Sequence, residues 1–206
     1  MRLLPFVLAL AIAAPAHAEL SVTARFGGWD VFHGAGTDGR QVCGIGTTNP
    51  TDGRAFSLRF AAGDDTITFT ADKPSWNIPE GTGIPVVMQV GLEQPWTEQA
   101  TGHTDRVIWS MPRTTVPLFD AQFRRASSMT LTFPAGSEQP WVISLRGSSA
   151  ASDAMGRCVT GLPQAAPVTA PPAAGGTTQP FGTTPEPPAA PAAGAGAPVT
   201  SPAPTH

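Results

Sequence analysis

His103 and Asp105, two positions apart in the sequence, are the residues of this chain that most resemble part of a catalytic site. A histidine polarised by a carboxylate acts as a general base in many hydrolases. No G-x-S-x-G sequence occurs, so the chain has no recognisable motif that would supply a nucleophile for this pair. We therefore interpret His103 as a histidine of a hairpin loop. The alternative is a hydrolase that uses His103 with Asp105 or with a carboxylate from another loop.

The other acidic residues suit turns better than catalysis or metal binding. Asp64 and Asp65 follow a glycine in a predicted hairpin turn, where aspartate is favoured for backbone reasons. No H-E-x-x-H motif occurs, and neither cysteine has a histidine close to it in the sequence. The sequence thus predicts no cofactor and no metal site.

Two tryptophans lie in loop-like contexts and are candidate binding residues. Trp76 stands between prolines, and Trp96 is followed by polar residues. Exposed tryptophans often mark a binding surface, and we take both, with His103, as candidates for partner binding. The competing interpretation is that these rings fold back to cover a sheet edge. The tryptophans in strand-like runs are predicted to lie in the core: Trp29, Trp109 and Trp141.

Cys43 and Cys158 are the two cysteines of the chain. Residues 1–18 have the form of a signal peptide, with Arg2, an apolar run and the cleavage pattern A-x-A at residues 16–18. Export would place the cysteines in an oxidising compartment, where two cysteines indicate a disulfide. Closing a loop of about 115 residues would contribute roughly 4–5 kcal/mol through the unfolded state.

Charge and hydropathy restrict the classes of partner that this chain could bind. The chain of 206 residues has a net charge of −3, with 13% charged residues and no basic cluster, so nucleic-acid binding is not supported. Beyond residues 1–18 no stretch is long and apolar enough to span a membrane. We expect a periplasmic or secreted protein, with outer-membrane association kept open, that has a protein or cell-envelope partner.

The elements that position these residues are mainly strands. Apolar and polar residues alternate over several segments, which predicts strands with one buried face, and glycine-rich turns separate them at hairpin spacing. We predict an antiparallel β-sandwich or flattened barrel over residues 19–162, closed by the disulfide. Short helices are expected at 117–125 and 149–155, the second with Ser148 or Ser149 as N-cap. The alternating segments are 56–60, 66–70, 86–90, 129–133 and 141–145.

Residues 163–206 consist mainly of Pro, Ala, Gly and Thr. Such a segment has too little apolar surface to offset the entropy of ordering, so a disordered tail is expected. It is interpreted as a spacer, or as an arm that crosses the cell wall or binds a partner.

Dispersed motifs in residues 26–160 resemble the invasion-associated locus B family of exported proteobacterial proteins. The resemblance implies a periplasmic or outer-membrane-associated β-sandwich with no established enzymology, and it matches Cys43 and Cys158 as a disulfide. No catalytic residue is carried over, and the long tail departs from the family pattern. The motifs are F-G-G-W-D-V-F at 26–32, Q-V-C at 41–43, T-T-N-P at 47–50, S-L-R-G-S-S-A-A at 144–151 and the cysteine at 158.

Three functional hypotheses follow from these observations. The first is an exported, non-enzymatic protein that binds a protein or envelope partner. The second is the envelope hydrolase with His103. The third is a structural module with a tail that spans the cell wall.

Overall fold

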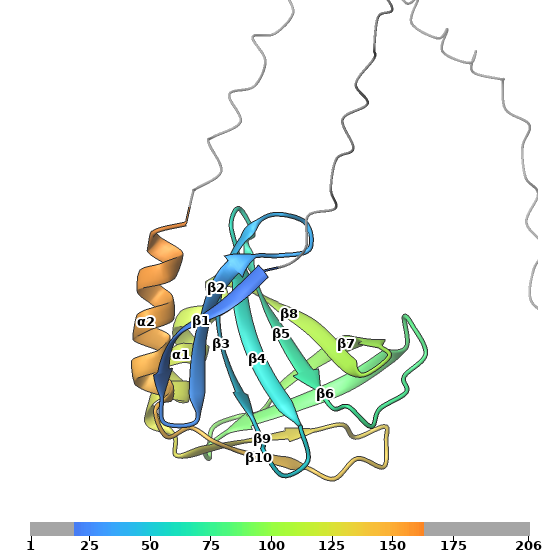
Figure 1. The fold of residues 1–206 in the computed structure, drawn as a ribbon. Coiled ribbons are helices and arrows are strands. Elements are labelled where there is room, and N and C mark those ends of the chain that lie inside the picture. Colours follow the sequence, from blue (N-terminus) through green and yellow to red (C-terminus); the bar gives the residue numbers. More distant parts are fainter. Residues whose placement is uncertain (1–18, 163–206) are drawn as a thin grey trace, which may run out of the picture. The chain divides into compact units, whose positions relative to one another are not determined.

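The computed structural model describes residues 19–162, which form ten strands, two α-helices and one 3-10 turn (Figure 1). The expected signal peptide at 1–18 and the expected tail at 163–206 lie outside the described residues. Within the described part of the chain, no helix is long and apolar enough to cross a membrane. The elements are β1 (Glu19–Phe26), β2 (Trp29–Ala35), β3 (Gln41–Thr48), β4 (Ala55–Ala61), β5 (Thr66–Asp72), β6 (Gly83–Val90), β7 (Trp96–His103), β8 (Arg106–Pro112), η1 (Arg113–Thr115), α1 (Val116–Arg125), β9 (Ser128–Thr132), β10 (Trp141–Ser144) and α2 (Ser148–Thr160).

The ten strands form one antiparallel sheet in the order β1-β2-β3-β4-β5-β8-β7-β6-β9-β10. The sheet curves strongly, so that its two halves face each other across a common core (Figure 1). The mainly β, antiparallel fold predicted from the alternating segments is therefore confirmed, and a single continuous sheet supplies both facing layers.

Aromatic rings fill the space that the curved sheet encloses. Phe56 of β4 lies 6.3 Å, between ring centroids, from Trp29 of β2 and from Trp109 of β8. Phe69 of β5 stacks on Trp109 at 5.6 Å. Trp29, Trp109 and Trp141 are 0–3% exposed, which confirms that they belong to the core. Burial of each such ring contributes about 1.5–3 kcal/mol or more to folding.

Helix α1 begins at Val116 with a proline in its first turn, one residue before the predicted start. Phe119 and Phe123, one helical turn apart, both point into the core. Phe119 packs edge-on against Phe69, and Phe123 packs edge-on against Trp29. The helix thus seals the enclosed aromatic core.

Helix α2 runs from Ser148 to Thr160 and is longer than the predicted 149–155. The helix continues past Gly156, which was expected near its end. A glycine inside a helix is only about 1 kcal/mol less favourable than alanine, and the contacts of the helix offset this. The predicted serine N-cap is also wrong, because Gly147 takes that position with a φ of 95° and no side chain caps the helix. Ser148 donates its hydroxyl hydrogen bond to the carbonyl of Phe123 instead, which ties α2 to the end of α1.

Cys43 of β3 and Cys158 of α2 form a disulfide, with their Cα atoms 5.9 Å apart. The predicted pairing is confirmed. Helix α2 packs against β1, β2 and β3, so the bond fastens the last described element to the first part of the sheet (Figure 1).

Candidate functional site

An apolar groove of about 350 Å³ opens where the β5–β6 loop meets the β9–β10 loop. Its lining includes two buried side chains, Val107 of β8, which is 1% exposed, and Phe133, directly after β9, which is 5% exposed. This volume is within the usual range for small-ligand sites. We call these residues the apolar groove: Trp76, Ile78, Thr82, Gly83, Ile84, Pro85, Val107, Phe133, Ala135, Gly136, Ser137 and Glu138.

Trp76 forms one wall of the apolar groove and is fixed in place by other aromatic rings. Its ring stacks on Trp141 with centroids 5.3 Å apart and planes inclined by 21°. It also meets the ring of Phe133 at 5.3 Å in an edge-to-face arrangement. Each such aromatic pair contributes about 0.5–1.5 kcal/mol beyond area burial. The wall is therefore preformed.

The carboxylate of Glu138 ties the two loops of the groove together. It accepts hydrogen bonds from Trp76 Nε1 at 3.2 Å, from Trp141 Nε1 at 2.9 Å and from Lys73 Nζ at 2.7 Å. Lys73 and Trp76 belong to the β5–β6 loop, whereas Glu138 belongs to the β9–β10 loop. Three donors on one carboxylate hold both loops in a single arrangement.

Electrostatics favour the ionised form of Glu138. Burial of its carboxyl group acts to raise the pKa, but the hydrogen bonds from Lys73, Trp141 and Trp76 outweigh burial and lower the pKa below its usual value. The side chain is 17% exposed and that of Lys73 is 24% exposed, so solvent screens this pair only in part. Glu138 has its acceptors occupied and so acts as an internal brace of the groove wall.

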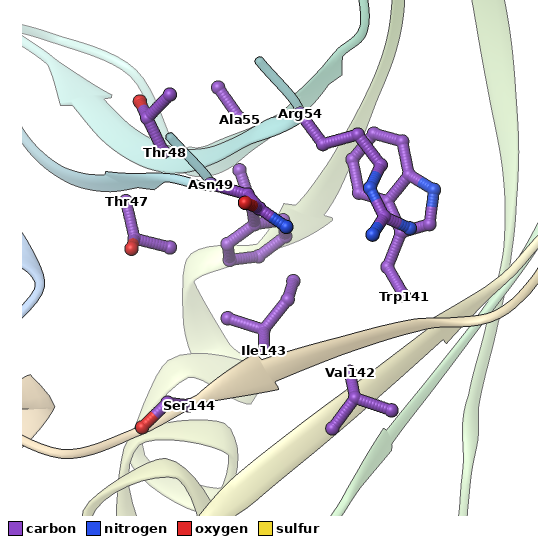
Figure 2. A pocket seen from close by; sticks show the side chains of 10 residues that line it. Thr47, Thr48, Asn49, Arg54, Ala55, Trp141, Val142, Ile143 and Ser144 are labelled. Atoms are coloured by element: carbon purple, nitrogen blue, oxygen red, sulfur yellow. The ribbon is translucent and has the colours of Figure 1, made fainter. Parts of the chain in front are cut away.

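A smaller hollow of about 200 Å³ lies between the β3–β4 turn and strand β10 (Figure 2). Arg54 extends its guanidinium group beside Trp141, with Cζ 5.3 Å from the ring centroid. Such a cation–π contact stabilises by about 0.5–2 kcal/mol. Trp141 thus links the hollow to the wall of the apolar groove. The hollow is lined by Thr47, Thr48, Asn49, Arg54, Ala55, Phe56, Trp141, Val142, Ile143 and Ser144.

Trp96 lies apart from the apolar groove. We expected it in a loop, but it is the first residue of strand β7, so that prediction is wrong. Its Nε1 donates a hydrogen bond to Gln122 Oε1 of α1 at 2.7 Å, and its ring packs edge-on against Phe119. These contacts make it part of the packing between β7 and α1.

His103 is not one of the residues that line the apolar groove or the hollow beside Arg54. It is the last residue of β7, not a loop residue, and its Nδ1 contacts the carboxylate of Glu80 from the β5–β6 loop. The side chain of Glu80 is 71% exposed. Asp105, the expected partner, instead contacts Arg106 at 3.2 Å. The geometry gives a histidine–carboxylate pair at the surface, formed by His103 and Glu80.

Lys73 and Glu138 were not singled out from the sequence. A weak sign of Glu138 exists, because E-Q-P-W occurs twice, at 93–96 and at 138–141. The two glutamates have different surroundings. Glu93 lies on the surface and contacts Arg125, whereas Glu138 accepts a hydrogen bond from Trp141 at the groove wall. Repetition alone therefore could not show which copy lies at the apolar groove.

Comparisons of the chain with protein-family models, with curated proteins and with solved structures found no match. The resemblance to the invasion-associated locus B family therefore depends on the motifs quoted above. The geometry of the apolar groove is the main guide to function.

Proposed function

We propose that this chain is an exported, non-enzymatic envelope protein, resembling the invasion-associated locus B family, which binds a protein or envelope component through the apolar groove. The observation that carries this proposal is the groove wall in which Trp76 stacks on Trp141 while both indoles donate to Glu138. A rigid aromatic wall loses little entropy when a partner binds to it.

The lining of the groove indicates the kind of group that it would take. Ile78, Ile84, Pro85 and Phe133 present apolar surface, and the nearby carboxylate of Glu138 is already bonded to Lys73. A charged group entering the groove would lose its hydration without gaining a free counter-ion. An uncharged apolar side chain or moiety of the partner fits this chemistry best.

The proposed compartment follows from the cleavage pattern at residues 16–18 together with the disulfide. A disulfide that closes a long loop is typical of proteins that fold outside the reducing cytosol. We place the protein in the periplasm or outside the cell, where the groove would face an envelope partner.

A defined apolar probe tests whether the groove binds ligands. The fluorophore N-phenyl-1-naphthylamine brightens in apolar surroundings and can be titrated against the purified mature chain. Gly136 lines the groove, and a Cβ there would have no other atom closer than 3.8 Å, so the backbone can accept a side chain. The indole of Gly136→Trp should therefore fill the groove. We expect at least a tenfold loss of probe affinity in this variant. The matched control is Thr97→Trp, on an exposed position of β7 outside the groove.

The partner itself is tested by photo-crosslinking. A photoreactive residue is placed at Ala135 in the groove, and the control carries it at Thr97. A discrete envelope product from position 135, lost in Gly136→Trp, supports the proposal. Equal products from both positions, or probe binding unaffected by Gly136→Trp, would contradict it.

A further inference from the structure

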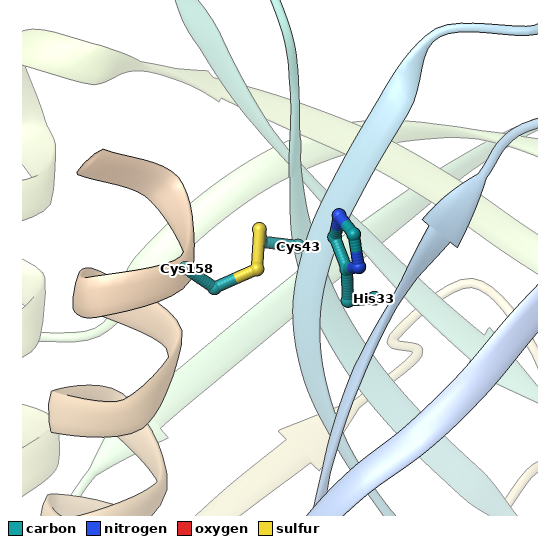
Figure 3. Close-up of side chains that lie close together, drawn as sticks. All are labelled: His33, Cys43 and Cys158. Atoms are coloured by element: carbon teal, nitrogen blue, oxygen red, sulfur yellow. A yellow bond between two sulfur atoms is a disulfide. The ribbon is translucent and has the colours of Figure 1, made fainter. Parts of the chain in front are cut away.

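A histidine lies beside the disulfide, although sequence spacing suggested none. His33 of β2 is directly opposite Cys43 of β3 in the antiparallel register. Directly opposite residues place their side chains on the same face of a sheet. The potential ligand atoms of His33, Cys43 and Cys158 lie within 4.8 Å of one another (Figure 3). His33 is ten positions from Cys43 along the chain and comes beside it only through the pairing of β2 with β3, so the sequence did not indicate this cluster.

We propose that reduction of the Cys43–Cys158 disulfide creates a binding site for a thiophilic d¹⁰ cation, with Zn²⁺ as the reference ion. The ligands would be the two thiolate sulfurs and the imidazole of His33. Two sulfurs and one nitrogen with an open fourth position form a recognised zinc coordination set.

The distances are compatible with such a site. Zinc binds sulfur at about 2.3 Å and imidazole nitrogen at about 2.0–2.1 Å, so ligand atoms around it lie roughly 3.3–3.8 Å apart. The three ligand atoms already fall within 4.8 Å of one another. Once the S–S bond is broken, the sulfurs can separate to the required spacing by small side-chain rotations.

Helix α2 has contacts that hold Cys158 near Cys43 without the covalent bond. Ala151 and Met155 of α2 are buried in the core. Arg124 of α1 contacts Asp153 at 2.6 Å, and the hydroxyl of Ser149 donates to the carbonyl of Arg124 at 3.1 Å. Reduction therefore removes one fastening of α2 and leaves several, so the ligands remain neighbours.

The difference in burial between the two cysteines decides which sulfur a reductant attacks first. Cys43 is 0% exposed, whereas Cys158 and His33 are half-buried and border solvent. A dithiol reductant attacks Cys158 sulfur, and Cys43 leaves as the thiolate. The second thiol of the reductant then releases Cys158, the reductant becomes a disulfide, and its two thiol protons pass to Cys43 and Cys158. Binding of Zn²⁺ by the two cysteines releases the thiol protons to solvent.

Cobalt(II) is the probe that tests the site, since thiolate coordination of Co²⁺ produces near-ultraviolet charge-transfer absorption and tetrahedral visible bands. The mature chain is reduced with a phosphine, freed of reductant without oxygen and titrated with Co²⁺ and then Zn²⁺. We expect one Co²⁺ per reduced chain, displaced by Zn²⁺, and none in the oxidised chain. Near-ultraviolet circular dichroism should show that the reduced chain keeps its aromatic packing.

His33→Ala should weaken Co²⁺ binding by about tenfold or more, because one ligand is lost. The matched control is His103→Ala. His103 contacts Glu80 and does not belong to the cluster of His33 with the two cysteines, so its removal should leave the Co²⁺ affinity unchanged. The double variant Cys43→Ser, Cys158→Ser should bind no Co²⁺. The proposal is overturned if reduced wild type binds no Co²⁺, if His33→Ala binds as tightly as wild type, or if reduction abolishes the packing signal.

Discussion

The indole Nε1 of Trp29 donates a hydrogen bond of 3.1 Å to the carbonyl oxygen of Ser144, 115 positions later in the chain. Trp29 begins β2 near one edge of the sheet and Ser144 ends β10 at the other edge. The bond therefore joins the two ends of the curved sheet. It also brings together two segments that carry the family resemblance, the F-G-G-W motif and the S-L-R-G motif.

Gly147→Ala should destabilise the protein strongly at this junction. Gly147 has a φ of 95°, and a Cβ there would lie 2.1 Å from the carbonyl oxygen of Phe26. Strain at such a φ costs about 1–3 kcal/mol, and the backbone overlap adds to it. We expect a loss of about 3 kcal/mol or more in the free energy of unfolding, measured by urea denaturation.

Gly39→Ala is the matched control for this prediction. Gly39 has a φ of 77°, but a Cβ there would meet no atom within 4 Å. The variant should therefore lose only the backbone component, about 1–2 kcal/mol. Equal losses in the two variants would show that the approach of Gly147 to Phe26 is unimportant.

Replacing both cysteines by serine should lower stability by up to about 4–5 kcal/mol, because the unfolded chain regains the freedom of a long loop. The fold should persist, since α2 keeps its buried side chains and its contacts with α1. Urea midpoints of oxidised wild type, reduced wild type and the serine variant give the measurement. A reductant should shift the midpoint of wild type and leave that of the serine variant in place.

Local patterns predicted much of the fold because they reflect local physics. Strict alternation in β4 and β5 places Phe56, Leu58 and Phe69 on one buried face, as the structure confirms. Two cysteines after a signal-like segment were enough to predict their pairing. The length of α2 was underestimated, because tertiary contacts continue the helix past Gly156. Strand β7 was not predicted at all, because its residues are mostly polar and they form a strand through pairing with β6 and β8.

The candidate site was mostly hidden from sequence reasoning, because its residues meet only after long-range packing. Trp76 and Glu138 are 62 positions apart, and nothing local indicates that their loops meet. The pairing of His33 with Cys43 depends on the strand register. Trp76 was identified as a candidate from its context between prolines, yet the carboxylate that holds it was not.

Glu98→Gln should raise stability near neutral pH. Glu98 lies opposite Val86 in the β6–β7 pairing and is half-buried, and burial raises the pKa of its carboxyl group. A raised folded pKa means that wild type loses stability as the pH rises through that range. Glutamine avoids this loss, so the Tm difference should be present near pH 7 and absent below about pH 4. The same Tm difference at both pH values would contradict the assignment.

Glu138→Gln should have the opposite pH dependence. Because the folded pKa of Glu138 is lowered, its contribution is present above the unfolded value of about 4.3 and is lost as the pH falls through the lower folded value. Glutamine also leaves the ammonium group of Lys73 without a carboxylate partner. We expect a loss of about 1.5–3 kcal/mol near pH 7, which is typical of hydrogen bonds to charged groups, and a smaller loss near pH 3.

Glu93→Gln is the matched control, since it is the glutamate of the other E-Q-P-W copy. Glu93 is 51% exposed and its contact with Arg125 is 3.6 Å long, so its removal should change stability by less than about 0.5 kcal/mol. Urea unfolding of wild type and both variants at the two pH values, followed by tryptophan fluorescence, provides the comparison. If Glu138→Gln loses as much near pH 3 as near pH 7, the carboxylate charge is not what holds Trp76, Trp141 and Lys73 together.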